Sequence, residues 1–469
     1  MPCVSCVMSI LAKGVTQSLG FSDVAYYNIA ILRMEDRVMY RKISKYLENW
    51  KDSPYRKPLI LQGARQVGKT YSVLEFGRNC YENVAYFNFE RNKGLYKTFD
   101  EDISPAYLVP LLSHISGQTI IREKTLIVFD EVQLCERALT SLKYFCEDEP
   151  SYHICALGSL LGVAVNRDKF SFPVGKVDMK TMHPMDMEEF LVAIGEGTLV
   201  ESARECFDKN LPMPSALHDS AMHYYRQYIV VGGMPECVMH FAETKDYILA
   251  RSLQAAILAN YLDDMSKYNQ KADIRKTRLA YESITVQLSK KNTRFQYKLV
   301  KKGGRASEFE NAIEWLSLSG IVSKVHKVDI PSKPLDDNRD IDAFKIYISD
   351  TGLLCAKKEL VAQDVLYMSD DLNFFKGGLS ENYVNTQLIS KGYNTYYWES
   401  NRGAEVDFII QRNGDIIPIE VKSADNSMAK SLKVYLDNYK PKYAIRLSAK
   451  NFGFEDGKKS VPLYAAFCI

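Results

Sequence analysis

The stretch that decides the fold lies at residues 63–70 and reads Gly63-Ala64-Arg65-Gln66-Val67-Gly68-Lys69-Thr70. It has the G-x-x-x-x-G-K-[ST] pattern of a phosphate-binding loop, follows an apolar run at 59–61 and precedes a predicted helix over 71–78. In this strand–loop–helix context, backbone N–H groups at a helix N-terminus point toward phosphate. We therefore expect the loop to bind ATP, with Lys69 on the β- and γ-phosphates and Thr70 on Mg²⁺; the alternative is a surface turn.

A second apolar run, Thr125–Phe129, ends in the acid pair Asp130-Glu131. A short continuous apolar run is typical of a strand that is buried on both faces. We expect Asp130 to orient the Mg²⁺ shell and Glu131 to polarise the attacking water. Acid pairs after strands are usually solvated, so this interpretation depends on the phosphate loop upstream.

Further apolar runs at 84–89 and 153–157 alternate with helical stretches. This alternation predicts a parallel sheet with helices on both faces. Gly158-Ser159 closes the last run. Ser159 is either a polar sensor of the γ-phosphate and the attacking water or a helix N-cap, and the sequence leaves both interpretations open.

Length and composition restrict the class of protein. A chain of 469 residues exceeds one ordinary core, so we expect two or three domains. Lys and Arg number 60 against 58 Asp and Glu, so overall charge argues neither for nor against a nucleic-acid partner. No apolar stretch reaches about 18 residues, so we expect no membrane contact. Scattered cysteines and no signal-peptide pattern favour a cytoplasmic location.

The chain divides into segments of different pattern. We expect a peripheral N-terminal segment at 1–38, a P-loop ATPase core at 39–200 and a helical, lid-like region at 201–274. A winged-helix-like segment follows at 275–350, with helices near 284–288 and 307–319 and an extended pair at 321–328 and 344–348. A terminal α/β domain occupies 351–469.

A basic cluster lies between the two helices of the winged-helix-like segment, with Phe295 and Tyr297 interleaved. Such a cluster on a helix-turn-helix would contact the phosphate backbone of DNA or RNA. The alternative is a solvated charged face. The cluster comprises Lys290, Lys291, Arg294, Lys298, Lys301, Lys302 and Arg305.

A β-hairpin is predicted near the C-terminus, because apolar runs at 406–410 and 416–421 flank the turn Asn413-Gly414. Alternation with period two puts Glu420 and Lys422 on one face, and pairing across the hairpin would bring Asp407 to them. The spacing D-(x12)-E-x-K is that of PD-(D/E)xK nucleases.

Carboxylates gathered on such a hairpin can hold a divalent metal, and a nearby lysine can stabilise charge on a phosphate. We expect Asp407 and Glu420 to be the metal ligands, with Lys422 beside them. Glu381, on a helix that begins near 379, would complete the metal shell. The alternative is a hairpin with ordinary salt bridges between its acidic and basic residues.

These stretches together resemble the prokaryotic AAA-type ATPases that carry a C-terminal domain of uncharacterised function. The resemblance rests on residues 63–70, 130–131, 157–162, 172–177, 182–190, 232–236, 347–354, 379–382, 405–408 and 419–422. It implies an AAA-like ATPase core, a winged-helix segment and a terminal domain with a restriction-endonuclease-like fold.

Two classes of function follow from this resemblance. One is a nucleotide-driven switch or motor whose terminal domain binds a partner or nucleic acid. The other is an ATP-regulated, metal-dependent nuclease. A homo-oligomer is an open alternative to a monomer, and the candidates for an arginine finger are Arg65, Arg167 and Arg226.

Overall fold

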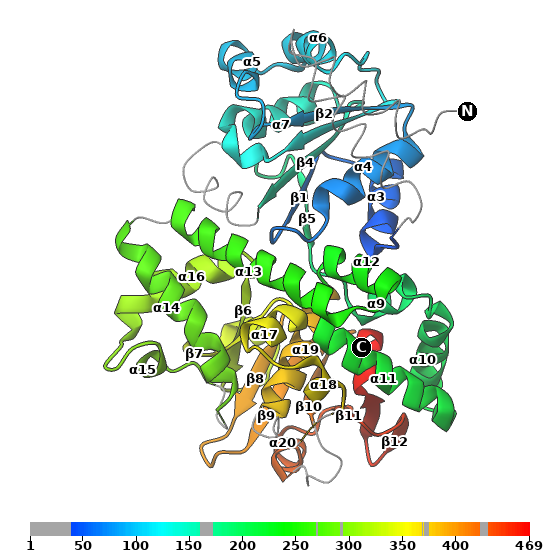
Figure 1. The fold of residues 1–469 in the computed structure, drawn as a ribbon, viewed down its shortest axis with the longest axis vertical. Helices are drawn as coiled ribbons and strands as arrows, with labels where there is room; N and C mark the ends of the chain where they lie inside the picture. Colours follow the sequence, from blue (N-terminus) through cyan, green and yellow to red (C-terminus); the bar gives the residue numbers. More distant parts are fainter. Residues whose placement is uncertain are drawn as a thin grey trace, which may run out of the picture.

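The computed structural model describes residues 39–159, 172–268, 271–290, 294–367, 369, 375–422 and 430–469. The predicted peripheral segment at 1–38 lies outside the described residues. Two bodies stand one above the other in Figure 1, each built around its own sheet, and helices α12 (Pro235–Thr244) and α13 (Tyr247–Tyr268) lie between them. No helix among the described residues has the length and apolar character that crossing a bilayer requires.

The first body contains a five-stranded sheet in the order β2-β3-β4-β1-β5, with every neighbouring pair parallel. The strands are β1 (Leu59–Gly63), β2 (Asn83–Asn88), β3 (Thr125–Asp130), β4 (His153–Ser159) and β5 (Asp178–Met182). The apolar runs predicted the first four. They did not predict β5, which pairs with β1 although only its two methionines are apolar.

Helices cover both faces of this sheet, as the alternating pattern predicts. One face packs on α3 (Lys42–Asp52) and α4 (Lys69–Cys80), and the other on α5 (Leu95–Glu101), α6 (Pro105–Ser116) and α7 (Glu136–Asp148). Strand β3 serves both cores, because Leu126 and Val128 face one and Ile127 and Phe129 face the other. Its apolar run is therefore buried on both sides, as its sequence indicates.

Helices occupy most of the chain between the two sheets, and residues 201–274, where the sequence predicts a helical region, lie among them. These helices begin with α9 (Met187–Ala193), α10 (Gly197–Lys209) and α11 (Ser215–Val231) and continue through α12 and α13. Helices α14 (Lys271–Leu288), α15 (Tyr297–Val300) and α16 (Ala306–Leu318) follow. They occupy the part of the chain where the sequence predicts the helices of a winged-helix-like segment.

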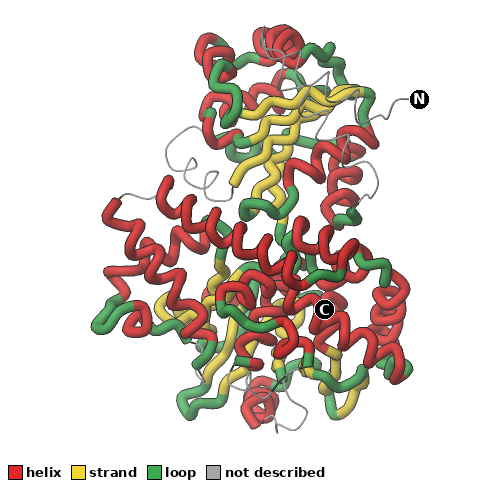
Figure 2. Tube along the Cα trace, in the orientation of Figure 1, coloured by secondary structure: helices red, strands yellow, loops and turns green. Residues whose placement is uncertain are grey.

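The second body contains an eight-stranded sheet in the order β12-β13-β11-β10-β9-β8-β6-β7. Figure 2 shows strands of this body in yellow, with helices in red packed around them. Its strands are β6 (Val322–Val328), β7 (Arg339–Ile348), β8 (Tyr396–Glu399), β9 (Glu405–Arg412), β10 (Asp415–Val421), β11 (Ala444–Ser448), β12 (Gly453–Glu455) and β13 (Lys458–Pro462). Its helices are α17 (Thr351–Lys357), α18 (Ala362–Leu366), α19 (Lys376–Ser390) and α20 (Lys430–Tyr439). The chain ends in the buried 3-10 turns η4 (Leu463–Cys468).

One sheet crosses the boundary that we expect at 350/351. Strands β6 and β7 form an antiparallel hairpin, as predicted, but β6 also pairs in parallel with β8, for example at His326 and Tyr396. The strand pair of the winged-helix-like segment is therefore part of the terminal sheet. The largest hydrophobic cluster confirms this continuity, because it extends from Met185 to Ile469.

Two glycine-containing motifs meet where the helical region contacts α17. The buried Asp350 carboxylate accepts backbone N–H groups from Gly233 (2.5 Å) and Leu353 (2.8 Å), and so caps α17 while holding the helical region. A Cβ on Gly233 would lie only 1.9 Å from the carbonyl oxygen of Met185. Only glycine fits this close approach of two backbones.

Candidate functional site

The phosphate loop joins β1 to α4 at the carboxyl end of the five-stranded sheet. Gly68 has a φ of 90° and precedes the first residue of α4, a conformation that favours glycine. The Lys69 ammonium lies over the loop and donates to the carbonyl oxygens of Gly63 (3.1 Å) and Ala64 (2.9 Å). Burial lowers the pKa of Lys69 to about 8, although the nearby Glu131 and Asp130 act to raise it.

The Asp130 carboxylate accepts a hydrogen bond from the Thr70 hydroxyl. Thr70 Oγ1 donates to Asp130 Oδ2 at 3.1 Å, so the loop threonine and the acid at the end of β3 are in direct contact. The same carboxylate oxygen accepts from the Tyr86 hydroxyl (2.6 Å) and from Asn88 Nδ2 (3.4 Å). A hydroxyl and a carboxylate are oxygen donors of the kind that Mg²⁺ prefers, so these residues fit the ion.

Tyr86 and Asn88 are residues of this site that sequence reasoning missed. They lie on β2, which pairs in parallel with β3 and sets Asn88 opposite Asp130. The available signal was two polar-tipped side chains, two residues apart, at the end of a predicted strand. That signal acquires a meaning only once β2 and β3 are known to be neighbours.

Glu131 sits at a backbone position that is unusual for a glutamate. Its φ is 54°, in the left-handed region, where a non-glycine residue is uncommon and often functional. Its carboxylate accepts from Gln133 Nε2 at 2.5 Å. Burial raises the pKa of Glu131, and the charge of Asp130 raises it further. A carboxylate with a raised pKa is a better proton acceptor near neutral pH.

Side chains from outside the sheet contact the phosphate loop directly. Arg65 forms an ion pair with Asp264 of α13 at 2.9 Å, and the Tyr261 hydroxyl donates to the Arg65 carbonyl at 3.3 Å. The buried Arg41 donates to the carbonyl of Val67 at 2.8 Å. The loop is thus held by the segment before α3 and by the helix that separates the two bodies.

Ser159 ends β4 beside the loop, in register with Gly63 of β1. Together with Arg65, Tyr261 and Asp264 it lines a small cavity of about 30 Å³. Residues 160–171 lie outside the described residues. The helix that Ser159 would cap and the candidate Arg167 both fall in this range. Arg226 lies on α11 in the second body.

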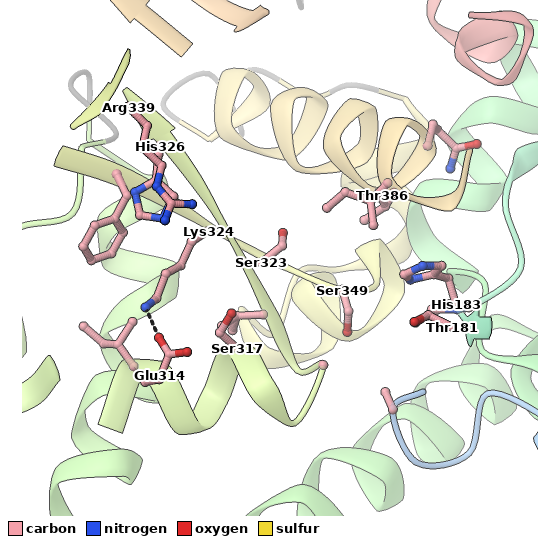
Figure 3. A pocket seen from close by; sticks show the side chains of 18 of the residues that line it. Thr181, His183, Glu314, Ser317, Ser323, Lys324, His326, Arg339, Ser349 and Thr386 are labelled. Atoms are coloured by element: carbon pink, nitrogen blue, oxygen red, sulfur yellow. Dashed lines mark hydrogen bonds and ion pairs between the residues drawn. The ribbon is translucent and has the colours of Figure 1, made fainter. Parts of the chain in front are cut away.

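A larger cleft of about 600 Å³ opens between the two bodies (Figure 3). Its lining includes Ala64 of the phosphate loop and His183, together with Ser323 of β6 and Thr386 of α19. Lys324 on its wall is paired with Glu314 of α16 at 2.5 Å. The cleft therefore extends from the phosphate loop to the eight-stranded sheet.

The two aromatic residues interleaved in the basic cluster pack against the core, Phe295 more deeply than Tyr297. Phe295 is buried and stacks on Phe344 with ring centroids 5.4 Å apart, and Tyr297 packs against Phe295 at 5.2 Å. Lys301 pairs with Glu308 at 3.2 Å, and Lys291 lies outside the described residues. Phe295 thus belongs to the core, and Tyr297 is half-buried and lines the large cleft.

The predicted C-terminal hairpin is present as β9 and β10, which pair antiparallel across the turn at Asn413-Gly414. Asp407 Oδ2 accepts the backbone N–H of Val421 at 2.7 Å. Glu420 Oε1 forms an ion pair with Lys422 at 2.5 Å. Burial raises the pKa of Asp407 to about 8, with a further contribution from the charge of Glu381.

Glu381 contacts two residues that the sequence did not single out. The Tyr347 hydroxyl donates to Glu381 Oε2 at 2.8 Å, and Lys345 Nζ lies 3.5 Å from the same oxygen. Lys345 also pairs with Glu405. Burial alone would lower the pKa of Lys345, yet the charge of Glu381 and its neighbours raises it. A lone lysine within an apolar strand was the only sequence signal.

This arrangement does not fit the metal site that the sequence predicts at Glu381, Asp407 and Glu420. Among the described residues, no group of three or more His, Cys, Asp or Glu side chains is placed to hold a metal ion. The chain itself supplies a partner to each of these carboxylates: an ammonium, a phenol or a backbone N–H. One oxygen of the site, Glu420 Oε2, is buried without a hydrogen-bond partner.

Comparison with protein families divides the chain into parts. Residues 55–191 match the family described as AAA domain. Residues 222–364 and 376–466 match two families that are each described as a domain of unknown function (DUF8612 and DUF4143). No curated protein matches the sequence. Residues 55–191, which hold the five-stranded parallel sheet, are therefore similar to an AAA domain.

Several solved structures are remotely similar. A Walker-type ATPase of Pyrococcus abyssi is 14% identical over 69% of this chain and 97% of its own, with a TM-score of 0.44. The ORC1 protein of Aeropyrum pernix in complex with DNA is 11% identical over 70% and 91%, with a TM-score of 0.27. Drosophila ORC bound to DNA is 11% identical over 77% and 98%, with a TM-score of 0.25.

Proposed function

We propose that this chain is an ATPase that acts as a nucleotide-driven switch, with ATP·Mg²⁺ bound at residues 63–70. The observation that carries the proposal is the 3.1 Å hydrogen bond from Thr70 to Asp130. In P-loop NTPases, the loop hydroxyl and the acid at the end of the neighbouring strand hold the Mg²⁺ together. The separate sequence stretches at 63–70 and 130–131 thus meet at the point where that chemistry requires them.

Each residue of the site has a defined role in this proposal. Lys69 exchanges its contacts with the loop carbonyls for contacts with phosphate, where its positive charge is best compensated. Thr70 and Asp130 hold Mg²⁺, which when bound neutralises negative charge on the phosphates. Glu131 accepts a proton from the attacking water, a role that its raised pKa favours.

The switch acts through Arg65. Its guanidinium is paired with Asp264 of α13, yet it belongs to the loop that receives the phosphates. A bound nucleotide competes with Asp264 for this guanidinium, because phosphate forms charge-assisted hydrogen bonds with arginine. Binding and release of the nucleotide would then change how α13 packs on the loop and, through α13, on the second body.

Two substitutions test the ATPase half of the proposal. Lys69→Ala removes a charge-assisted contact worth about 1.5–3 kcal/mol, so ATP affinity measured by calorimetry falls roughly tenfold to over a hundredfold. Glu131→Gln still binds ATP but releases phosphate far more slowly. A Lys69→Ala variant with unchanged affinity would refute the site, and a Glu131→Gln variant at the wild-type rate would show that another group activates the water.

A matched pair of substitutions tests the switch. Asp264→Asn removes the charge that competes with phosphate for Arg65, whereas Asp263→Asn removes the same charge from the exposed neighbouring position on α13. A partly exposed ion pair is worth up to about 1 kcal/mol, so we expect ATP to bind roughly two- to fivefold more tightly to Asp264→Asn. Equal affinities in the two variants would show that Asp264 does not compete with nucleotide for Arg65.

A further inference from the structure

Lys345 brings a positive charge to the carboxylates of Glu381 and Glu405 beside the eight-stranded sheet, a pair that we call the acidic pocket. Its side chain is fully buried in β7, and its ammonium contacts Glu405 of β9 and, at 3.5 Å, Glu381 of α19. Tyr347, two residues further along the same strand, donates its hydroxyl to Glu381 at 2.8 Å. Side chains two residues apart on a strand share a face, so β7 presents both groups to the carboxylates.

The ammonium and the carboxylates come from different parts of the chain. Lys345 lies within 222–364, which matches one family, and Glu381 and Glu405 lie within 376–466, which matches another. Strand β7 reaches the pocket because its hairpin partner, β6, pairs with β8. The ammonium therefore comes from one matched region and the carboxylates that it contacts come from the other.

A buried ammonium is stable only where carboxylates compensate its charge. Buried carboxylates likewise need a cation to compensate theirs. A divalent ion at Glu381 and Glu405 would need the oxygen atoms that Lys345 contacts, and its charge would repel the ammonium. Lysine and metal are therefore alternatives at Glu381 and Glu405. Of the carboxylates next to them, Glu420 keeps one buried oxygen, Oε2, without a hydrogen-bond partner. Asp407 accepts a backbone N–H, and Glu420 is paired with Lys422.

We propose that Lys345 is the built-in cation of this pocket: its ammonium occupies the place of a divalent metal between Glu381 and Glu405, and joins the two C-terminal regions without a metal. The proposal is independent of the ATPase function, since it concerns residues of the second body only. It also removes the metal-dependent nuclease from the functions that this pocket supports.

The test is a titration of the full-length, nucleotide-free protein with Mn²⁺, read by electron paramagnetic resonance and by Tm. All variants carry Asp130→Asn, so that the phosphate-loop site does not contribute. The parent and Lys345→Arg, which keep a cation in the pocket, should bind no Mn²⁺ there. Lys345→Met, of similar length but uncharged, should have a lower Tm than the parent and gain a Mn²⁺ site that raises its Tm by about 2–5 °C.

Glu381→Gln added to Lys345→Met should abolish the gained site. Mn²⁺ binding by the parent that Glu381→Gln abolishes would overturn the proposal, because metal and lysine would then share the pocket. A Lys345→Met variant with the Tm of the parent and no gain of Mn²⁺ would overturn it too. If Lys345→Met does not fold, the parent and Lys345→Arg decide the test. Mn²⁺ binding that depends on Glu381 in either protein refutes the proposal, and the absence of Mn²⁺ binding in both proteins supports it.

Discussion

Replacing Tyr86 by phenylalanine removes the shortest of the three side-chain hydrogen bonds to Asp130 Oδ2, the one of 2.6 Å. A hydrogen bond to a charged group contributes about 1.5–3 kcal/mol. Thr70 and Asn88 still donate to the same oxygen, at 3.1 and 3.4 Å, so we expect the lower end of this range. That corresponds to a loss of roughly tenfold, which is also the lower end for changes in the outer shell of a metal site.

The assay is phosphate release at fixed ATP over a series of Mg²⁺ concentrations. We expect Tyr86→Phe to require roughly tenfold more Mg²⁺ for half-maximal rate, since Asp130 is less well oriented. Tyr107→Phe is a matched control, because the Tyr107 hydroxyl also donates to a carboxylate at 2.6 Å, that of Glu101 on the surface. The same Mg²⁺ requirement in both variants would refute the role assigned to Tyr86.

Three further predictions concern stability and partners. Gly233→Ala should lower the free energy of unfolding by about 3 kcal/mol or more, because its Cβ meets the Met185 carbonyl, whereas Gly197→Ala, which faces open space, should not lower it; urea denaturation compares them. Burial lowers the pKa of His153 from 6.5 to about 4, so below pH 6.5 the unfolded chain binds a proton that the folded protein does not. Stability should therefore fall by up to roughly 3 kcal/mol from pH 6.5 to 4, and His153→Asn should show a flatter pH profile of urea midpoints. If the basic cluster binds DNA or RNA, the double substitution Lys298→Glu and Lys302→Glu should weaken binding and reduce its salt dependence; absence of salt-sensitive binding by the wild-type protein would make the cluster a solvated face.

The parts of the fold that were predictable are those with a local signal. The phosphate loop, the buried strand before Asp130 and the hairpin around Asn413-Gly414 each have their pattern within a short stretch. Strand β5 was not predicted because it has no apolar run, and its pairing with β1 depends on tertiary structure. The parallel pairing of β6 with β8 joins strands that are far apart in the sequence, and no local pattern reports such a contact.

The same distinction separates the two candidate sites. Lys69, Thr70 and Asp130 follow from motifs, whereas Tyr86 supports Asp130 only because β2 lies beside β3. In the second body, the D-(x12)-E-x-K spacing located the carboxylates but said nothing of Lys345, whose strand arrives from another region of the chain. The spacing motif identifies the acidic side chains, whereas the pairing of strands from distant parts of the chain determines which cation neutralises them.

The sheet shared by β6, β7 and β8 has a consequence for how this protein can be divided. A fragment that starts at residue 376 would turn β8 into an edge strand, with the aromatic side chains of Tyr396 and Trp398 beside an unpaired backbone. Such edges recruit other strands and promote aggregation. The same cut removes Lys345 and leaves Glu381 and Glu405 without their ammonium. The two C-terminal regions therefore form a single folding unit, and a stable fragment that contains the terminal region has to begin before β6.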